Sequence, residues 1–114
     1  MRDLIRHGDL LLRPIDKVRE GDVRPRSSKV ILEGEITGHA HRLLEDGEAT
    51  ILDYYEKTWR EEKPVRRDTY VQVASTVTLT HEEHGPLTIA PGLYEVIRAR
   101  EFDYAANLAR RVYD

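Results

Sequence analysis

The chain has 114 residues, a net charge of −3 and 34% charged residues, which fits one soluble domain around a single core. The absence of cysteine excludes disulfides, zinc ribbons and thiol catalysis, and the net negative charge argues against nucleic-acid binding. The sequence contains no membrane-span or signal-peptide pattern. We therefore expect one cytoplasmic domain over residues 1–114.

The first third of the chain predicts two short strands separated by a loop. The apolar run at residues 10–15 predicts a strand, and the polar residues 16–28, which include a glycine and a proline, predict a loop. Val30, Leu32 and Ile36 then alternate with polar residues, which is typical of a strand with one buried face.

A hairpin is expected next in the sequence. Residues 38–44 predict a strand, and Asp46-Gly47 is a common dipeptide in tight hairpin turns. The return strand is expected over about residues 49–55.

The second half of the chain continues this pattern. The charged residues 56–68 predict either a short helix or a solvated loop, and the β-branched residues 69–81 predict one continuous strand. A short strand is expected at 87–89, and a long one from 93 to about 102. The tail at 107–113 fits either a helical turn or a docked strand.

Seven or eight short strands with turns between them predict an all-β fold, as a small barrel or a two-sheet sandwich. Helices that alternate with strands are not predicted, which argues against a parallel α/β sheet.

Four of the five histidines fall into two short clusters, and the first lies on the predicted strand at 38–44. His39, His41 and Leu43 share one face of that strand, because side chains two residues apart point the same way. An inward Arg42 would be costly without a partner, so we expect the histidines to point inward. The alternation then changes phase relative to the preceding strand, and Gly38 is the expected bulge.

The second cluster is His81-Glu82-Glu83-His84. His81 shares a face with Val77 and Leu79 and should also point inward, whereas the turn after His84 must orient that side chain. His7 stands alone near the N-terminus and is expected to be exposed.

The two clusters together predict a divalent metal site. Two histidines at i and i+2 on a strand can chelate one ion, and a carboxylate completes a site for Zn, Fe, Ni or Mn. Glu45 lies on the face of the first pair, and Glu95 is a second candidate carboxylate. Glu82 and Glu83 are expected at the rim, where they would orient a small polar ligand. The predicted ligands are His39, His41, His81, His84 and Glu45.

Two resemblances bear on this site. Gly34-(x4)-His39-x-His41-(x3)-Glu45 resembles the first motif of cupins, and Gly85-(x5)-Pro91-Gly92-(x2)-Glu95 resembles their second, with glutamate where cupins have histidine. The resemblance implies a jelly-roll barrel in which His39, His41 and Glu45 bind a metal. The chain is also similar to small bacterial and phage proteins that carry GEVTGHAH and HEEH stretches, and this similarity implies no function.

Three functions are compatible with these observations. The first is a metal-dependent, cupin-like enzyme or ligand-binding protein, and the second is a non-catalytic module that forms a homo-oligomer or joins a larger complex. The third is a metal-free hydrolase that uses histidines as acid and base. The sequence carries no nucleotide or flavin signature.

Overall fold

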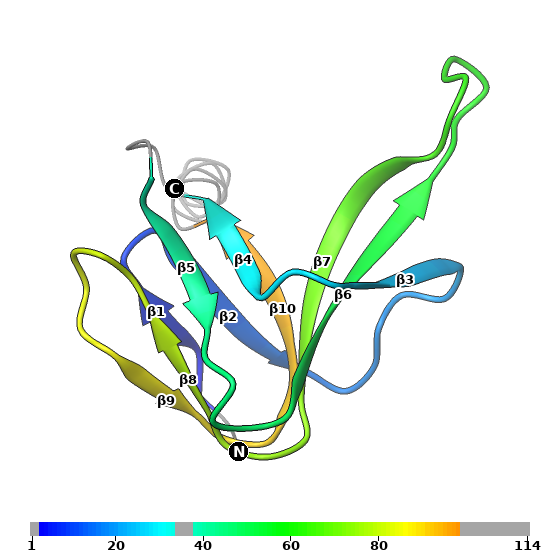
Figure 1. Ribbon diagram of the computed structural model, residues 1–114. Helices are drawn as coiled ribbons and strands as arrows, with labels where there is room; N and C mark the ends of the chain where they lie inside the picture. The colour runs from blue at the N-terminus through cyan, green and yellow to red at the C-terminus, as the bar shows by residue number, and fades with distance from the viewer. Residues whose placement is uncertain (1–2, 34–37, 99–114) are drawn as a thin grey trace, which may run out of the picture.

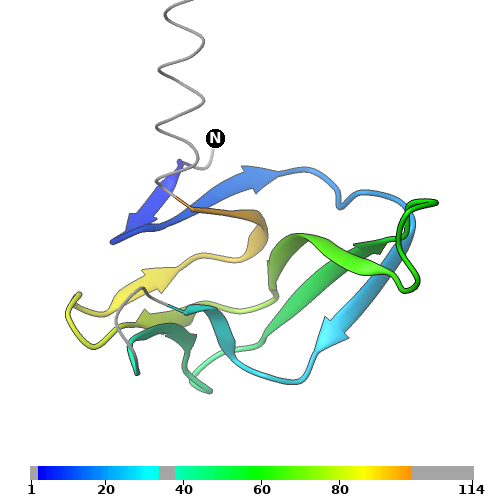
Figure 2. The same ribbon diagram turned by 90° about the horizontal axis from the view of Figure 1, so that it is seen from above.

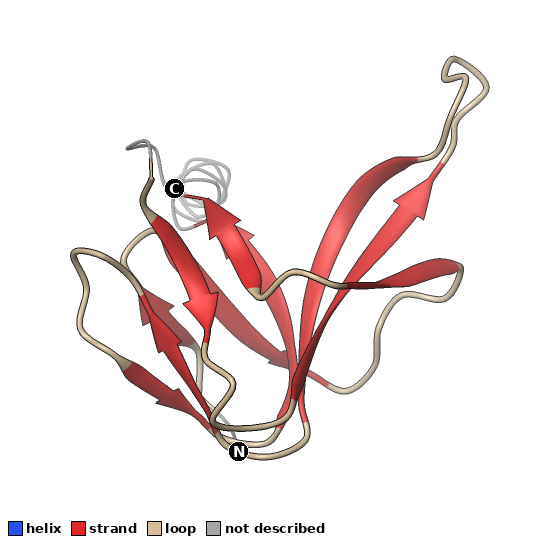
Figure 3. Cartoon of the chain, viewed as in Figure 1, coloured by secondary structure: helices blue, strands red, loops and turns tan. Residues whose placement is uncertain are grey.

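The computed structural model describes residues 3–33 and 38–98, and all its regular structure is β (Figures 1 and 3). The predicted all-β class is therefore confirmed. Ile36 and the predicted features beyond Arg98 lie outside the described residues. The strands are β1 (Ile5–His7), β2 (Leu10–Ile15), β3 (Asp22–Arg26), β4 (Val30–Glu33), β5 (Ala40–Leu43), β6 (Ala49–Glu56), β7 (Val65–Val73), β8 (Val77–Thr80), β9 (Leu87–Ile89) and β10 (Gly92–Arg98).

These strands form two antiparallel sheets around one core. The larger sheet has the order β1-β2-β10-β7-β6-β3, and the smaller has the order β4-β5-β8-β9. Figure 2 shows the blue strands β1 and β2 on one side and the teal β5 and yellow β9 on the other. Both sheets contribute alternate apolar side chains to the core, namely Leu10, Leu12, Ile31, Leu43, Ala49, Ile51, Val71, Val73, Val77, Leu79, Ile89 and Tyr94. No helix in the described part of the chain is long and apolar enough to cross a membrane.

The hairpin predicted at Asp46-Gly47 is wrong, because β5 and β6 belong to different sheets. Asp46 accepts hydrogen bonds from the backbone N–H and the hydroxyl of Thr78, at 3.1 and 2.5 Å. Gly47 does not have the positive φ that a type I′ hairpin turn requires. A Cβ on Gly47 would lie 2.0 Å from the carbonyl oxygen of Thr76, so glycine is needed here for close approach of two backbones.

The single strand predicted over 69–81 is also wrong, because residues 74–76 carry the chain from β7 in one sheet to β8 in the other. The carbonyl of Glu48 accepts hydrogen bonds from the N–H groups of Ala74 and Ser75, at 2.7 and 3.2 Å. These bonds replace the ladder that a continuous strand would have made. The β5–β6 and β7–β8 crossings therefore lie against each other and stabilise one another.

The loop predicted over 16–28 contains a strand, β3, which pairs with β6. Pro25 lies inside this strand opposite Leu52. Proline lacks an N–H donor but is tolerated on edge strands, and β3 is the edge of the larger sheet.

On β4 the buried residue is Ile31, and the predicted inward residues Val30 and Leu32 are only partly buried. The pairing with β5 shifts between Val30 and Leu32, so that one extra residue stands on β4. The predicted change of phase therefore occurs at a bulge in β4, not at Gly38.

The charged segment predicted over 56–68 contains no helix: residues 57–64 form the loop of a β6–β7 hairpin, and residues 65–68 belong to strand β7. This hairpin projects from the body of the molecule (Figure 1). Trp59 lies in its loop and is 86% exposed.

Candidate functional site

All five histidines lie close together at one end of the two sheets. His7 is the last residue of β1, His41 lies in β5 with His39 just before it, and His81 and His84 follow β8. Neighbouring rings in this group have centroids between 4.5 and 6.3 Å apart. The predicted convergence of the two histidine clusters is therefore present, and the prediction that His7 is exposed is wrong.

The strand register explains how His41 and His81 meet. β5 and β8 pair with Arg42 opposite Thr80 and Leu43 opposite Leu79, so the next position brings His41 beside His81, with ring centroids 4.5 Å apart. His41 is completely buried, as the alternation along β5 predicts.

His7 reaches the same place from the larger sheet, because Gly8 and Asp9 turn the chain sharply from β1 into β2. His7 pairs with Leu10 across this two-residue turn, and Gly8 has a φ of +64°. Its missing side chain also leaves room for His84, since a Cβ on Gly8 would lie 2.4 Å from His84 Nε2. A Gly-Asp pair between two strands is a hairpin signal that could have placed His7 beside the core.

Asp9, His41 and His7 form a chain of hydrogen bonds. His41 Nε2 lies 2.7 Å from Asp9 Oδ1, and His41 Nδ1 lies 2.9 Å from His7 Nδ1. At the end of the chain, His7 Nε2 donates to the Gly85 carbonyl, which is 2.8 Å away. With Asp9 ionised, these three bonds need three hydrogens on the rings, whereas two neutral imidazoles carry only two. Formation of all three bonds at once would therefore require one extra proton on the two rings, and the charge of Asp9 would balance it.

The electrostatics of this chain favour an ionised Asp9. Burial acts to raise the pKa of Asp9, but the hydrogen bond and charge of His41 outweigh it, so the pKa falls below its ordinary 3.8. Burial lowers the pKa of His41 below 6.5, and Asp9 offsets this only in part. The imidazole of His41 therefore holds a proton less firmly than an exposed histidine does.

His39, His81 and Glu82 form a separate group of metal-ligand type. One potential ligand atom from each residue lies within 4.8 Å of the others. His39 Nδ1 is the single buried side-chain nitrogen or oxygen in the described residues without a hydrogen-bond partner. The nearest carboxylate, that of Glu83, lies 3.7 Å away. Such an orphan atom is costly unless something binds it.

Glu82 is fixed as a carboxylate anion. Its Oε2 accepts a hydrogen bond from the Ala40 backbone N–H at 2.8 Å, and its Oε1 accepts one from Arg42 at 2.7 Å. The Ala40 bond, the Glu82 backbone and Arg42 together lower the pKa of Glu82 to about 2. Since a carboxylate can accept about four bonds, lone pairs remain for an ion. The sequence placed Glu82 at the rim, and its role in holding β5 was missed.

The other predicted carboxylates lie elsewhere. Glu45 is exposed in the segment between β5 and β6, and Glu95 on β10 is paired with Arg13. The described carboxylates that approach the histidines are those of Asp9, Glu82 and Glu83. The structure thus brings together four of the five predicted ligands, namely His39, His41, His81 and His84, and leaves Glu45 away from them.

No curated protein and no solved structure matches the chain. A family match does exist, and it spans residues 6–99, which include every residue of the site. The chain therefore belongs to the family described as a domain of unknown function, DUF8820.

Proposed function

We propose that this protein binds a divalent transition-metal ion through His39, His81 and Glu82. The observation that carries the proposal is His39 Nδ1, a buried nitrogen without a hydrogen-bond partner, whose side chain stands beside a second imidazole and an ionised carboxylate. Burying such an atom without a partner is unfavourable, and ligation of an ion would satisfy it.

The donor set narrows the choice of ion. Two imidazoles and one carboxylate bind zinc in hydrolytic enzymes and iron(II) in oxygenases, and both leave positions open for water or substrate. Bonds of about 2.1 Å place neighbouring donor atoms about 3.3 Å apart. The group must therefore contract from its present limit of 4.8 Å, and the exposed turn that carries His81 and Glu82 can supply that movement. His81 Nδ1 now accepts the Glu83 N–H at 3.0 Å, so an ion bound there would replace that hydrogen.

His41 has a different role in this proposal from the one that the cupin resemblance implies. Both of its ring nitrogens are already engaged, by His7 and by Asp9. We assign the Asp9–His41–His7 chain to holding and moving a proton beside the ion, and His84 to the rim. A cupin-like metal enzyme or ligand-binding protein stays within this proposal, with Glu82 in the place of Glu45.

The test is metal binding by the full chain, purified without an affinity tag and treated with a chelator. Calorimetric titration with Zn²⁺ and Co²⁺ should give one ion per chain, and Co²⁺ absorption should report a site of low coordination number. His39→Ala and His81→Ala should each weaken binding at least about 100-fold, since a site of three protein ligands cannot spare one.

Glu45→Gln is the matched control and should leave metal affinity unchanged. It removes a carboxylate that the sequence predicted as a ligand but that is exposed between β5 and β6. The proposal fails if no ion binds stoichiometrically at micromolar concentration. It also fails if His39→Ala and His81→Ala keep the wild-type affinity while circular dichroism shows that they are folded.

A second candidate, the non-catalytic assembly module, is favoured by the β6–β7 hairpin. Its loop exposes Trp59 almost completely, and tryptophan is among the residues that anchor protein interfaces most often. Light scattering during gel filtration should then show an oligomer that Trp59→Ala dissociates. A monomer at high concentration would remove the homo-oligomeric form of this candidate.

A further inference from the structure

A cleft of about 520 Å³ lies on the described surface, bordered by β4 of one sheet and by β7 and β10 of the other, and none of its described lining residues is a histidine. Its apolar lining includes Leu32, Val96 and Ile97, and its carboxylates are Asp68 and Glu95. Five arginines also line it: Arg13, Arg26, Arg66, Arg67 and Arg98. The cleft is therefore basic, with an apolar part.

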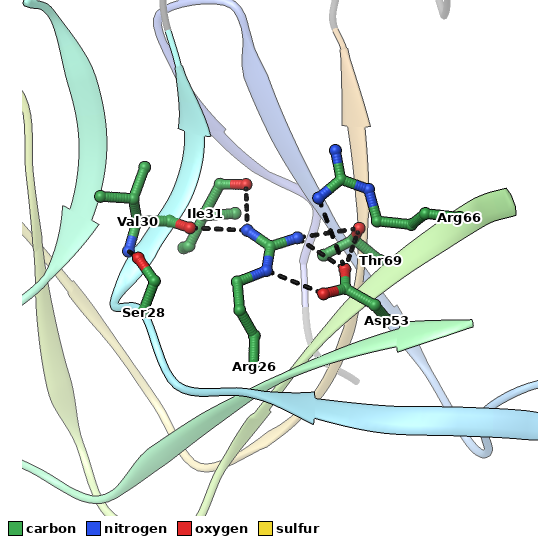
Figure 4. Close-up of polar contacts among 7 residues, drawn as sticks. All are labelled: Arg26, Ser28, Val30, Ile31, Asp53, Arg66 and Thr69. Atoms are coloured by element: carbon green, nitrogen blue, oxygen red, sulfur yellow. Dashed lines mark hydrogen bonds and ion pairs between the residues drawn. The ribbon is translucent and has the colours of Figure 1, made fainter. Parts of the chain in front are cut away.

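The guanidinium of Arg26 is occupied by hydrogen bonds within the protein (Figure 4). Its Nε and Nη2 donate to the two oxygens of Asp53, at 2.8 and 2.5 Å. Its Nη1 donates to the carbonyls of Val30 and Ile31, at 2.7 and 3.3 Å. This guanidinium joins β3, β4 and β6 and has little left to offer a ligand.

Two more of the arginines are neutralised by carboxylates. Arg13 is bonded to Glu95, and Arg67 is bonded to Glu61. Asp68, the other carboxylate of the cleft, pairs with Arg19 at 3.2 Å. These contacts leave the positive charge of the cleft concentrated on Arg66 and Arg98.

Arg66 and Arg98 have only loose ion pairs with other described residues. Arg66 lies 4.0 Å from Asp53, whose charge Arg26 already balances, and Arg98 lies 3.8 Å from Asp9. Their side chains are 55% and 39% exposed. Figure 4 shows Arg66 beside Asp53, with part of its guanidinium directed away from that carboxylate. Two guanidinium groups are thus available to an anion that enters the cleft.

We propose that this cleft binds a small amphiphilic anion, in which a phosphate or carboxylate is joined to an apolar group. Guanidinium groups bind both oxyanions through paired hydrogen bonds, and Arg66 and Arg98 would supply them. The apolar group would cover Leu32 and Val96. The cleft volume falls within the range of about 300–1,000 Å³ that is usual for small-molecule sites. The proposal does not depend on the metal site, since neither arginine is among its ligands.

The test uses calorimetry on metal-free full-length protein with four probes: hexyl phosphate, hexanoate, inorganic phosphate and hexanol. Hexyl phosphate or hexanoate should saturate one site, and should bind at least about tenfold more tightly than inorganic phosphate or hexanol, because burial of the alkyl chain adds to the ionic contact. The tighter of the two amphiphiles identifies the oxyanion.

Arg66→Gln and Arg98→Gln should each weaken that binding at least about tenfold, the usual effect of losing a charged hydrogen-bond donor. Arg24→Gln is the matched control and should leave it unchanged, because Arg24 is an exposed arginine outside the cleft that pairs with Asp22. The proposal is overturned if neither amphiphile saturates below 10 mM (roughly the weak end of specific ligand binding), or if all three variants bind equally well.

Discussion

Replacing Arg26 by methionine tests how the two sheets are joined at β3 and β4. The Arg26–Asp53 pair is nearly buried, with 17% and 6% of the two side chains exposed. Methionine keeps most of the aliphatic stem and removes the charge. It leaves Asp53 with one close bond, from Thr69 Oγ1 at 2.8 Å, and leaves the Val30 and Ile31 carbonyls without their donor.

The expected loss is about 3–5 kcal/mol, the usual cost of leaving one partner of a buried ion pair uncompensated. That is a large fraction of the roughly 5–15 kcal/mol by which domains are stable. The double variant Arg26→Met, Asp53→Leu should lose less than Arg26→Met alone, because no charge is left buried without a partner. Arg24→Met is the control, since its ion pair with Asp22 is exposed and contributes little.

Urea unfolding followed by far-ultraviolet circular dichroism measures these differences, since the highly exposed Trp59 is a poor fluorescent reporter of the core. The reasoning is refuted if Arg26→Met loses no more stability than Arg24→Met. It is also refuted if the loss of the double variant equals the sum of the losses of Arg26→Met and Asp53→Leu measured separately.

The same pair predicts a pH dependence. Burial acts to raise the pKa of Asp53, but the bonds from Arg26 and Thr69 outweigh it and lower the pKa below 3.8. A carboxyl group with a lowered pKa stabilises the fold above its ordinary pKa, and this contribution is lost as the pH falls toward the folded value. The stability difference between wild type and the double variant should therefore narrow below about pH 3.8. A constant difference in urea titrations from pH 7 to 3 would contradict this.

Three further predictions concern the glycines and the ion. Gly8→Ala should lower the free energy of unfolding by about 1–2 kcal/mol, because the φ of Gly8, +64°, is left-handed. Adding His84→Ala should remove only the further cost of the contact between the new Cβ and His84, and urea unfolding of both variants measures this. Gly47→Ala should lose at least about 1–3 kcal/mol because its Cβ would meet the Thr76 carbonyl; a loss below 0.5 kcal/mol, about the noise of surface substitutions, would mean that the crossing relaxes. Zn²⁺ at 100 times its Kd should raise stability by about 2.7 kcal/mol in wild type and not in His39→Ala, which calorimetric melting measures.

The sequence predicts best where one strand has one buried face. Val77 and Leu79 are buried as their alternation predicts, and so are His41 and Leu43. It fails where a contact distant in sequence decides the structure. Nothing local to residues 69–81 shows that Glu48 will accept the N–H groups of Ala74 and Ser75 and divide the strand.

The site was predictable to the same degree. The periodicity of β5 and β8 brings His41 and His81 together, but the position of His7 depends on how β1 and β2 join the sheet. Both ring nitrogens of His41 are hydrogen-bonded because the β1–β2 turn places His7 and Asp9 beside this ring. The pattern of histidines in the sequence therefore indicates a site. The role of each histidine depends on the hydrogen-bond partners that the folded structure places beside it, and the sequence pattern does not show these partners.

The position of β2 in the larger sheet sets the order in which the site can be assembled during protein synthesis. β2 pairs only with β1 and β10 among the described strands, so β10 links the segment with His7 and Asp9 to the rest of that sheet. The pairing of Leu10 with Arg98 joins positions at nearly opposite ends of the described chain, and such distant contacts form slowly. A nascent chain still lacking β10 can make the β5–β8 contact but cannot hold His7 against it. The Asp9–His41–His7 chain of hydrogen bonds is therefore completed only after β10 has left the ribosome, whereas His39, His81 and Glu82 need only the pairing of β5 with β8 and can meet before it.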